Sequence, residues 1–416
     1  MPENLSAQLE KFLPPPVLAL IKIAGRNADA MGQKLYVVGG VVRDLFLDRG
    51  NFDFDLVIEG EAISLARQMA RDSAAKLILH ERFGTAKLIY PEFSLDLATA
   101  RSETYSRPGA LPMVKPGRLN DDLIRRDFSI NAMALHLNPE QFGQLIDLYH
   151  GKDDIQHKLI RILHPKSFID DATRILRAVR YEQRLGFRLE RETEKLLRRD
   201  VAMLDTISGD RLRHELELIL KEHEPERAFA RAGELGVLKH LHPSLKADSK
   251  LARAFTRARE TVKSALPTIY LCLLIYDLTE KESEEFIARL NFPNTSAEAM
   301  RQTLRFKKVR SKLEKSHLKP SQIYQLLHGY SAVVVQANDI ASESPTITQN
   351  LILYLDKLRY VKSILNGKDL MKMGVPSGPK VGEILDALLK AKLNGEVRTR
   401  KDEEKLVLNK LWQTLS

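Results

Sequence analysis

The chain has 416 residues, enough for two to four structural units, and its formal net charge of +10 favours a polyanionic partner. A basic protein without such a partner is the alternative. Aromatic residues make up only 6% of the chain and there is one Trp, which argues against broad stacking platforms for single-stranded nucleic acid.

The single cysteine, Cys272, lies within an apolar run and has no second cysteine with which to form an internal disulfide. We therefore expect a buried thiol and a reducing, cytoplasmic location. The longest apolar run, around residues 266–278, is too short to span a bilayer, so no membrane partner is expected. Glu3, Glu10 and the triple proline at 14–16 are typical neither of a secretory signal nor of a transit peptide.

The first 150 residues combine short β-like runs with helical segments. Apolar and β-branched residues predict strands at residues 35–38, 53–58, 86–89, 94–98 and 145–148. Beyond about residue 155 the β signal fades, and helices separated by Pro and Gly loops follow. This order predicts an α+β head followed by a long all-α portion.

A glycine pair ends the first predicted strand. Gly39-Gly40 lead into what reads as a helix, and Arg43 lies one turn inside it. A glycine turn at a helix start presents backbone N–H groups to an anion, although such a pair is more often only a tight turn. Gly39, Gly40 and Arg43 are therefore candidates for positioning a phosphate group.

Two acids open the second predicted strand. Asp53 and Asp55 are two positions apart, so their side chains point to the same face of that strand. Such carboxylates repel each other unless a cation lies between them, and Mg²⁺ both takes oxygen ligands and pairs with substrate phosphates. A solvated edge or a helix cap is the alternative. A phosphate cradle followed by this pair favours chemistry on a nucleoside triphosphate.

A third acid, Asp96, lies in the strand predicted at 94–98. If that strand neighbours the one that carries the first two acids, Asp96 completes a three-carboxylate site; otherwise it is simply an acid near a strand end. The Pro- and Gly-rich segment 101–120 is predicted to be a mobile loop that leads to a helix at Asp122.

Two adjacent arginines and an acid follow at Arg125-Arg126-Asp127. Adjacent arginines cannot both face a core, so one interpretation is a solvated pair. The other is that their planar guanidinium groups contact a triphosphate or a ribose, with Asp127 holding an arginine in place.

A later helix carries both acids and arginines. It begins like a capped helix with acids at its positive end, and Asp171 and Arg174 share a face on which they could form an ion pair. Arg174, Arg177, Tyr181 and Arg184 recur at helical spacing. This basic stripe is either a solvated face or the border of a nucleotide pocket.

Taken in order, these motifs resemble those of the DNA polymerase β-like nucleotidyltransferases, and this variant is similar to class II CCA-adding enzymes and bacterial poly(A) polymerases. The resemblance covers nearly the whole chain and is strongest over residues 36–187. It implies a polymerase β-like head with a small mixed sheet at residues 1–150. An elongated all-α neck (151–222), body (223–330) and tail (331–416) would follow.

The resemblance also implies a role for each motif. Asp53, Asp55 and Asp96 would be the catalytic acids, and the first two would hold Mg²⁺. The residues that bind the nucleotide would be Gly39, Gly40, Arg43, Arg126, Asp127, Asp171, Arg174 and Arg177. Within that set, Asp171 and Arg174 would read the incoming base.

The chemistry of the bases makes this last role physically sound. Cytosine and adenine both present an amino donor beside an unprotonated ring nitrogen, which a carboxylate and a guanidinium can match. Uracil and guanine present a carbonyl beside a ring N–H, which reverses the pattern. Each good bidentate contact is worth roughly 1–3 kcal/mol of discrimination.

The predicted activity is template-independent transfer of CMP, AMP or both from CTP and ATP to the 3′ end of tRNA, which would lie along the helical portion. The alternatives are a bacterial poly(A) polymerase and an enzyme that adds only CC or only A. A non-catalytic RNA-binding protein on a decayed transferase fold is a further alternative from a different class.

Overall fold

The computed structural model describes residues 3–50, 53–71, 73, 75–110, 112–264, 266–315 and 317–415, without the side chains of residues 53 and 411–415. The chain divides into two compact units. The first comprises Met1–Leu216 with Arg231–Leu241, and the second comprises Glu217–Ala230 with His242–Ser416.

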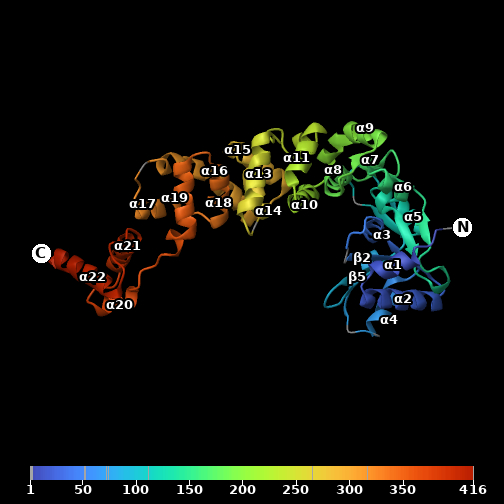
Figure 1. Ribbon diagram of the computed structural model, residues 1–416, viewed down its shortest axis with the longest axis horizontal. Coiled ribbons are helices and arrows are strands. Elements are labelled where there is room, and N and C mark those ends of the chain that lie inside the picture. Colours follow the sequence, from blue (N-terminus) through green and yellow to red (C-terminus); the bar gives the residue numbers. More distant parts are fainter. Residues whose placement is uncertain are drawn as a thin grey trace. The chain divides into compact units, whose positions relative to one another are not determined.

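A seven-stranded mixed sheet organises the first unit (Figure 1). Its strands, in spatial order, are β3 (Lys76–His80), β4 (Thr85–Ile89), β5 (Ser94–Thr99), β2 (Asp53–Glu59), β1 (Lys34–Val38), β8 (Met133–His136) and β9 (Leu145–Asp147). Only β2 and β5 run parallel to each other, and all the other pairs are antiparallel. The five strands predicted from the sequence are confirmed as β1, β2, β4, β5 and β9.

The sequence did not predict β3 and β8. All four residues of β8 are buried, so the strand lacks the alternation of polar and apolar residues by which a half-buried strand is recognised. β3 pairs with a single neighbour at the sheet edge, and none of its side chains is fully buried. Weak burial leaves an edge strand with little hydrophobic pattern.

Some helices of the first part of the chain pack against this sheet, and others follow the sheet in the sequence. In order they are α1 (Ser6–Phe12), α2 (Pro15–Ala30), α3 (Gly40–Phe46), α4 (Ala62–Arg71), α5 (Leu119–Ile124), α6 (Gly151–Gln156), α7 (Ser167–Asp170), α8 (Thr173–Leu185), α9 (Arg191–Asp200), α10 (Gly209–Leu220), α11 (Pro225–Glu234) and α12 (Leu238–Leu241). Two short parallel strands, β10 (Leu159–Ile160) and β11 (Arg188–Leu189), lie among them.

The prediction of a mobile loop at 101–120 is corrected by the structure. Within that segment, β6 (Arg101–Thr104) and β7 (Met113–Pro116) form an antiparallel hairpin that ends just before α5. Each strand has only four residues, and the prolines and glycines between and beyond them dominated the sequence pattern. The hairpin therefore has defined backbone hydrogen bonds where the sequence predicted none.

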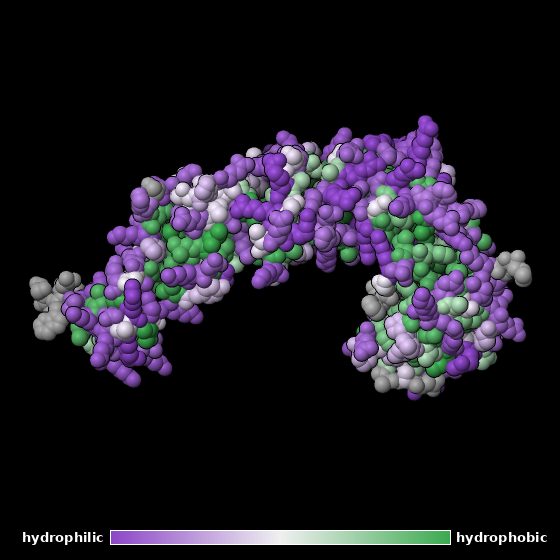
Figure 2. Space-filling model, viewed as in Figure 1, coloured by the Kyte–Doolittle hydropathy of each residue, from purple (hydrophilic) through white to green (hydrophobic). Residues whose placement is uncertain are grey.

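The second unit is helical. Its elements are α13 (Ser249–Thr261), α14 (Leu266–Leu274), α15 (Glu280–Leu290), α16 (Asn294–Leu313), α17 (Pro320–Leu327), α18 (Ala332–Ile340), α19 (Pro345–Asp356), the short 3₁₀ turn η5 (Leu358–Tyr360), α20 (Gly367–Lys372), α21 (Pro379–Leu393) and α22 (Arg400–Leu415). Hydrophilic residues cover most of the visible surface around α11 and α13 (Figure 2).

Two separate apolar clusters support the C-terminal half of this unit. One joins Phe306 and Leu327 to Leu358, and the other joins Leu365 and Leu370 to Val407. Cys272 in α14 is a buried free cysteine, as predicted, and burial raises the pKa of its thiol to about 11. Among the described residues, no helix combines the length and the apolar character needed to cross a membrane.

Candidate active site

The parallel pairing of β2 with β5 brings predicted acids together. In its register, Asp55 lies directly opposite Asp96. Phe54 and Leu56 point into the core, and Asp55 between them is exposed, as expected from the alternation of side chains along a strand. Asp53 opens β2 opposite Ser94, but its side chain lies outside the described residues. The strand arrangement needed for a three-acid site is therefore present.

A lysine accompanies the third acid. Lys87 of β4 is the register partner of Asp96, and its Nζ atom lies 2.7 Å from Asp96 Oδ2. No group of three His, Cys, Asp or Glu side chains capable of holding a metal ion is found among the described residues, a set that excludes the Asp53 side chain. Asp55 and Asp96 still supply the oxygen donors that hard divalent cations require.

The glycine turn has the backbone geometry that only glycine adopts readily. Gly39 has φ 77° and ψ −130°, immediately before α3. A Cβ atom at this position would lie 2.7 Å from Arg126 Nη1, so the Arg126 guanidinium rests directly against the turn. The close approach places a cation of the Arg-Arg-Asp motif beside the backbone that begins α3.

Arg43 is almost completely buried. Its side chain is 5% exposed and donates to the carboxylate of Asp44 and, at 2.7 Å, to Asn131 Oδ1. Its guanidinium also lies 5.3 Å from the ring centre of Tyr181 in α8. Arg43 thereby connects α3 with α8.

A hollow of about 740 Å³ in the first unit gathers most of the predicted residues. It is lined by Gly39, Gly40, Arg43, Asp55, Arg126, Asp127, Asp171, Arg174 and Arg177. Asp96 instead lines a smaller hollow of about 330 Å³, which shares Asp55 and Arg126 with the first. The predicted triphosphate, base and metal residues therefore converge from the sheet, α3, α5 and α8 on two adjoining spaces.

Both arginines of the Arg-Arg-Asp motif are held by one buried carboxylate, so the solvated-pair interpretation is wrong. Asp122 is fully buried, and it accepts hydrogen bonds from Arg125 Nε and Arg126 Nη2, each at 3.0 Å. Burial by itself would raise the Asp122 pKa, but the two guanidinium charges outweigh it and lower the pKa. Asp122 thus keeps both cations ordered at the hollow.

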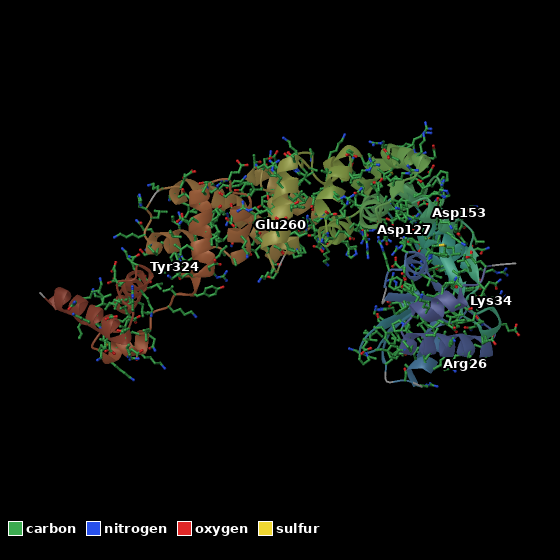
Figure 3. All side chains as sticks on the ribbon, viewed as in Figure 1. Arg26, Lys34, Asp127, Asp153, Glu260 and Tyr324 are labelled. Carbon is green, nitrogen blue, oxygen red and sulfur yellow. The ribbon has the colours of Figure 1, made fainter. Side chains whose placement is uncertain are left out.

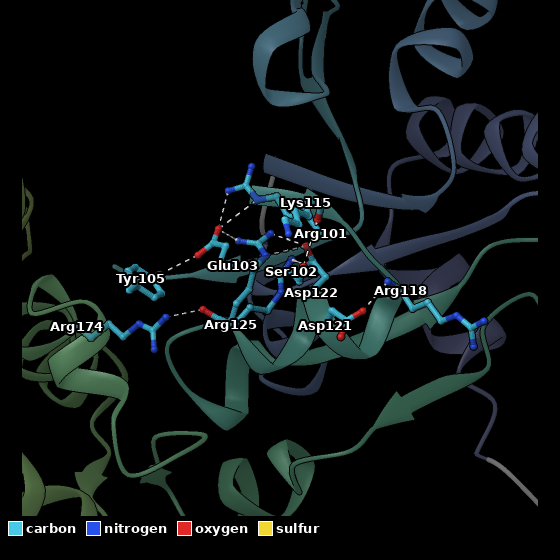
Figure 4. Close-up of polar contacts among 11 residues, drawn as sticks. Arg101, Ser102, Glu103, Tyr105, Lys115, Arg118, Asp121, Asp122, Arg125 and Arg174 are labelled. Atoms are coloured by element: carbon cyan, nitrogen blue, oxygen red, sulfur yellow. Dashed lines mark hydrogen bonds and ion pairs between the residues drawn. The ribbon is translucent and has the colours of Figure 1, made fainter. Parts of the chain in front are cut away.

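The hairpin contributes an additional acid and a tyrosine (Figure 4). Glu103 of β6 pairs with Arg125 at 3.1 Å and with Arg101 at 3.0 Å. The Tyr105 hydroxyl donates to Glu103 at 2.9 Å, and burial followed by the charge of Glu103 raises the Tyr105 pKa. Glu103 and Tyr105 also line the larger hollow, which makes the hairpin one of its walls.

Asp127, which is labelled in Figure 3, forms an ion pair with Arg177 of α8. Its carboxylate accepts from Arg177 Nη2 at 2.6 Å and from Asn131 Nδ2 at 3.0 Å, and it also accepts from the Phe128 backbone N–H at 2.8 Å. Burial would raise the pKa of Asp127, but the Arg177 charge and these hydrogen bonds lower it. The negative charge of Asp127 in turn raises the pKa of Arg177.

Asp171 and Arg174 do not pair with each other in the described structure. Asp171 lies outside the helix, between α7 and α8, and its Oδ1 accepts from the Thr173 backbone N–H at 3.0 Å and from Arg211 Nη2 at 2.6 Å. Arg174 donates instead to Ser167 Oγ at 2.6 Å and to the Arg125 carbonyl oxygen (Figure 4). The intrahelical ion pair considered from the sequence is therefore wrong.

The basic stripe of α8 faces the hollow. The hollow is lined by Arg174, Arg177, Tyr181 and Arg184, of which Arg184 is exposed, so the stripe borders the hollow that holds the other predicted nucleotide-binding residues. Tyr181 is surrounded by three guanidinium groups, because Arg177 and Arg180 lie 5.6 Å and 5.2 Å from its ring centre in addition to Arg43. The ring provides a face on which these cations are ordered.

Several residues of the hollow were not identified from the sequence. Glu103 and Tyr105 were assigned to a loop, although short alternating runs on either side of Pro108-Gly109 are a hairpin signal. Arg211, which does not line the hollow itself, was not identified either, and it is the ion-pair partner of Asp171. No local pattern could reveal this pair, because 40 positions separate its two members.

Comparison with known proteins adds three family matches. Residues 35–161 match the Poly A polymerase head domain, residues 186–249 match an RNA- and SrmB-binding site of polymerase A, and residues 261–404 match tRNA nucleotidyltransferase domain 2. Together they extend over the head and most of the helical portion.

Among curated relatives, the chain is 32% identical to an A-adding tRNA nucleotidyltransferase of Halalkalibacterium halodurans, covering 96% of this chain and 94% of that protein. It is 36% identical to an A-adding enzyme of Geobacter sulfurreducens over 96% of this chain, but spans only 48% of that relative's length. It likewise spans 45% of an A-adding relative from Aquifex aeolicus. The chain thus has about half the length of these last two proteins.

Solved structures of CCA-adding enzymes are similar to this chain over nearly its whole length. A Thermotoga maritima CCA-adding enzyme complexed with tRNA aligns with a TM-score of 0.79 at 32% identity, over 98% of this chain and 99% of that one. A CCA-adding enzyme complexed with ATP aligns with a TM-score of 0.82 at 30% identity, over 100% and 99% of the two chains.

The Asp127–Arg177 contact predicts a pH-dependent contribution to stability. The folded-state pKa of Asp127 is lowered, so the contact stabilises the fold above the ordinary aspartate pKa of about 3.9 and loses its effect as pH falls through the lower folded-state value. Asp127→Asn should therefore lower Tm at pH 7, and the difference from wild type should shrink below about pH 4. Thermal melts from pH 3 to 8 measure this.

Asp153→Asn is the matched control, since that carboxylate is 64% exposed in the same unit and should give little change at any pH. A Tm difference for Asp127→Asn that is constant across the whole range would contradict the assignment.

Proposed function

The chain belongs to the family of tRNA nucleotidyltransferases that includes A-adding and CCA-adding enzymes, and we propose that it transfers nucleotides from nucleoside triphosphates to the 3′ end of tRNA. The observation that carries this proposal is the convergence on one hollow of a glycine turn, an exposed acid and the Asp171 and Arg174 side chains. These are the groups that phosphate binding, metal binding and base reading each require.

We assign the metal-binding role to Asp53 and Asp55, assisted by Asp96. The adjacent carboxylates of Asp55 and Asp96 offer oxygen donors suited to a hard divalent cation, and Mg²⁺ is the ion we propose. When bound, it would activate the RNA 3′-hydroxyl and neutralise charge on the triphosphate. Lys87 partly neutralises Asp96 and so limits the repulsion among these acids.

The triphosphate would be oriented by this chain's own cations and backbone. Gly39 and Gly40 line the hollow where α3 begins, and Arg126 lies against the turn. Asp122 keeps Arg125 and Arg126 ordered, which reduces the entropy lost when phosphate binds. The same hollow is also lined by Arg43, Asp127 and Arg177.

The incoming base would be read by Asp171 and Arg174. Because Arg211 and Thr173 hold the Asp171 carboxylate, the acid and Arg174 do not neutralise each other. The carboxylate can then accept from the amino group of cytosine or adenine while the guanidinium donates to the ring nitrogen. This division assigns catalysis to residues 1–150, base recognition to 151–222, and tRNA binding to the body (223–330) and tail (331–416).

A-addition is the form of the activity that the relatives favour. A-adding relatives are 32–36% identical over most of the chain, whereas CCA-adding relatives are 27–28% identical. Complete CCA addition is the second candidate, because the similar structures include a CCA-adding enzyme complexed with CTP at 32% identity.

A substrate-end assay separates these two candidates. With ATP and CTP supplied separately and together, an A-adding enzyme should extend only tRNA that ends in CC, and only with AMP. A CCA-adding enzyme should also incorporate CMP on tRNA lacking CA or the whole CCA. Products resolved at single-nucleotide length give the answer, and absence of extension on every substrate would overturn the proposed function.

Removal of a metal-binding carboxylate should stop chemistry and spare RNA binding. Asp55→Asn should lower the transfer rate by at least about 100-fold, the scale for loss of one group that stabilises developing charge, while the tRNA Kd is unchanged. EDTA should likewise abolish transfer by the wild type. Asp48→Asn, which neutralises an exposed acid in the turn after α3, should leave the rate unchanged. Normal turnover of Asp55→Asn would exclude the metal assignment.

Loss of the base-reading carboxylate should weaken base selection. Asp171→Ala should reduce the discrimination against UTP by about 5- to 100-fold, since one bidentate contact is worth about 1–3 kcal/mol. The measurement is the ratio of kcat/KM for ATP or CTP to that for UTP. Asp153→Ala serves as the control in the same unit, and unaltered UTP exclusion in Asp171→Ala would refute the template role.

A further inference from the structure

The most exposed large apolar side chain among the described residues is Tyr360, at 65%. It ends η5, and we call residues 359–364 the strap, which comprises the last two residues of η5 and the segment that leads toward α20. Exposure of this degree needs an explanation, because the chain has few aromatic residues and most of the tyrosines with a described side chain are at least partly buried.

The strap is anchored at both ends. Leu358, just before it, is 2% exposed within the first apolar cluster of the second unit, and Leu365, just after it, is 1% exposed within the other. The buried Glu403 carboxylate accepts from the backbone N–H groups of Ile364 at 2.9 Å and of Leu365 at 2.8 Å. Tyr360 is therefore displayed on a fixed segment, and ordering it costs a ligand little additional entropy.

The side chains of the strap alternate. Tyr360, Lys362 and Ile364 are exposed, while the intervening Val361 and Ser363 are partly buried. This is the period of two expected of extended backbone, with one face packed and the other presented to solvent. The presented face thus carries an aromatic ring, a cation and an aliphatic side chain in a row.

Most of the exposed charged residues that flank Tyr360 in the sequence are basic. Lys357, Arg359 and Lys362 are exposed, against one exposed acid, Asp356. The Arg359 guanidinium lies 5.0 Å from the Tyr360 ring centre, and none of these three cations has an ion-pair partner among the described residues. The strap therefore complements a ligand that combines negative charge with a flat, stackable group.

We propose that the strap binds RNA, with Tyr360 stacking on an unpaired base and with Lys362 and Arg359 contacting the adjacent phosphates. A nucleotide chain supplies both features, whereas an acidic peptide supplies the charge without a regular planar partner. This inference rests on the proposed function for its RNA partner, and it adds base stacking to a helical portion otherwise expected to bind backbone and shape.

The binding test compares Tyr360→Ala and Tyr360→Phe with the wild type in the full chain. Stacking on one base is worth about 1–3 kcal/mol, so Tyr360→Ala should weaken tRNA binding by about 5- to 100-fold and Tyr360→Phe should restore it. Ile352→Ala is the matched control, because it removes another exposed apolar side chain, 44% exposed, from α19. Its Kd should equal that of the wild type. Lys362→Ala should lower the salt dependence of log Kd by about one unit.

A fluorescence experiment tests directly whether a base stacks on the side chain at position 360. In a Trp412→Phe background, Tyr360→Trp leaves a single Trp on the strap. Its fluorescence should be quenched by a tRNA transcript and much less by a fully paired RNA duplex of equal length. Equal quenching by both would overturn base stacking.

The outcomes distinguish the strap from the proposed function. If the wild type extends tRNA normally and Tyr360→Ala binds it equally well, the strap proposal is overturned and the activity stands. If tRNA binding depends on Tyr360 but the wild type extends no tRNA end, the proposed activity alone is overturned.

Discussion

The site depends first on the parallel pairing of β2 with β5. This is the only parallel contact in the seven-stranded sheet, and its register sets Asp55 beside Asp96. Two carboxylates on adjacent strands repel each other, and the ion pair of Lys87 with Asp96 offsets part of that repulsion in the protein alone. A shift of one residue in this register would turn one acid to the opposite face and separate the pair. The sheet thus determines whether the acids can act together.

Positive charge at the hollow is ordered by acids behind it. Asp122 holds Arg125 and Arg126, and Asp127 holds Arg177; both acids are buried and both have lowered pKa values. A buried carboxylate that is paired and hydrogen-bonded stays ionised, and its partner cations are held in one orientation. This arrangement keeps the guanidinium groups near the glycine turn and α8 without requiring a ligand to order them.

Asp171 is also held by an arginine, but it does not pair with the arginine that lies nearest to it in the sequence. Its partner is Arg211 of α10 rather than Arg174 of the adjacent helix, while Arg174 is satisfied by Ser167 and by the Arg125 carbonyl group. The contact between Arg174 and Arg125 links the proposed base-reading residue to the motif that we propose contacts the triphosphate. Glu103 of the hairpin also contacts Arg125, so the hairpin is connected to the same residues (Figure 4).

The sequence by itself determined the local features of this protein. The period of two placed Asp53 and Asp55 on one face of a strand, and the glycine pair predicted the turn before α3; five of the seven strands followed from composition. Local patterns are informative there because each is set by backbone geometry within a few residues. Family motifs then indicated which residues would meet.

Only the tertiary structure decided which charged groups are partners. Strand order makes Asp96 the neighbour of Asp55. Helix packing makes Asp122 the shared partner of two arginines and Arg211 the partner of Asp171. The hairpin within 101–120 and the fully buried β8 were likewise decided by pairing with distant segments. A long ionised side chain can adopt several conformations of similar free energy. Its ion-pair partner is therefore determined by long-range packing rather than by neighbouring residues in the chain.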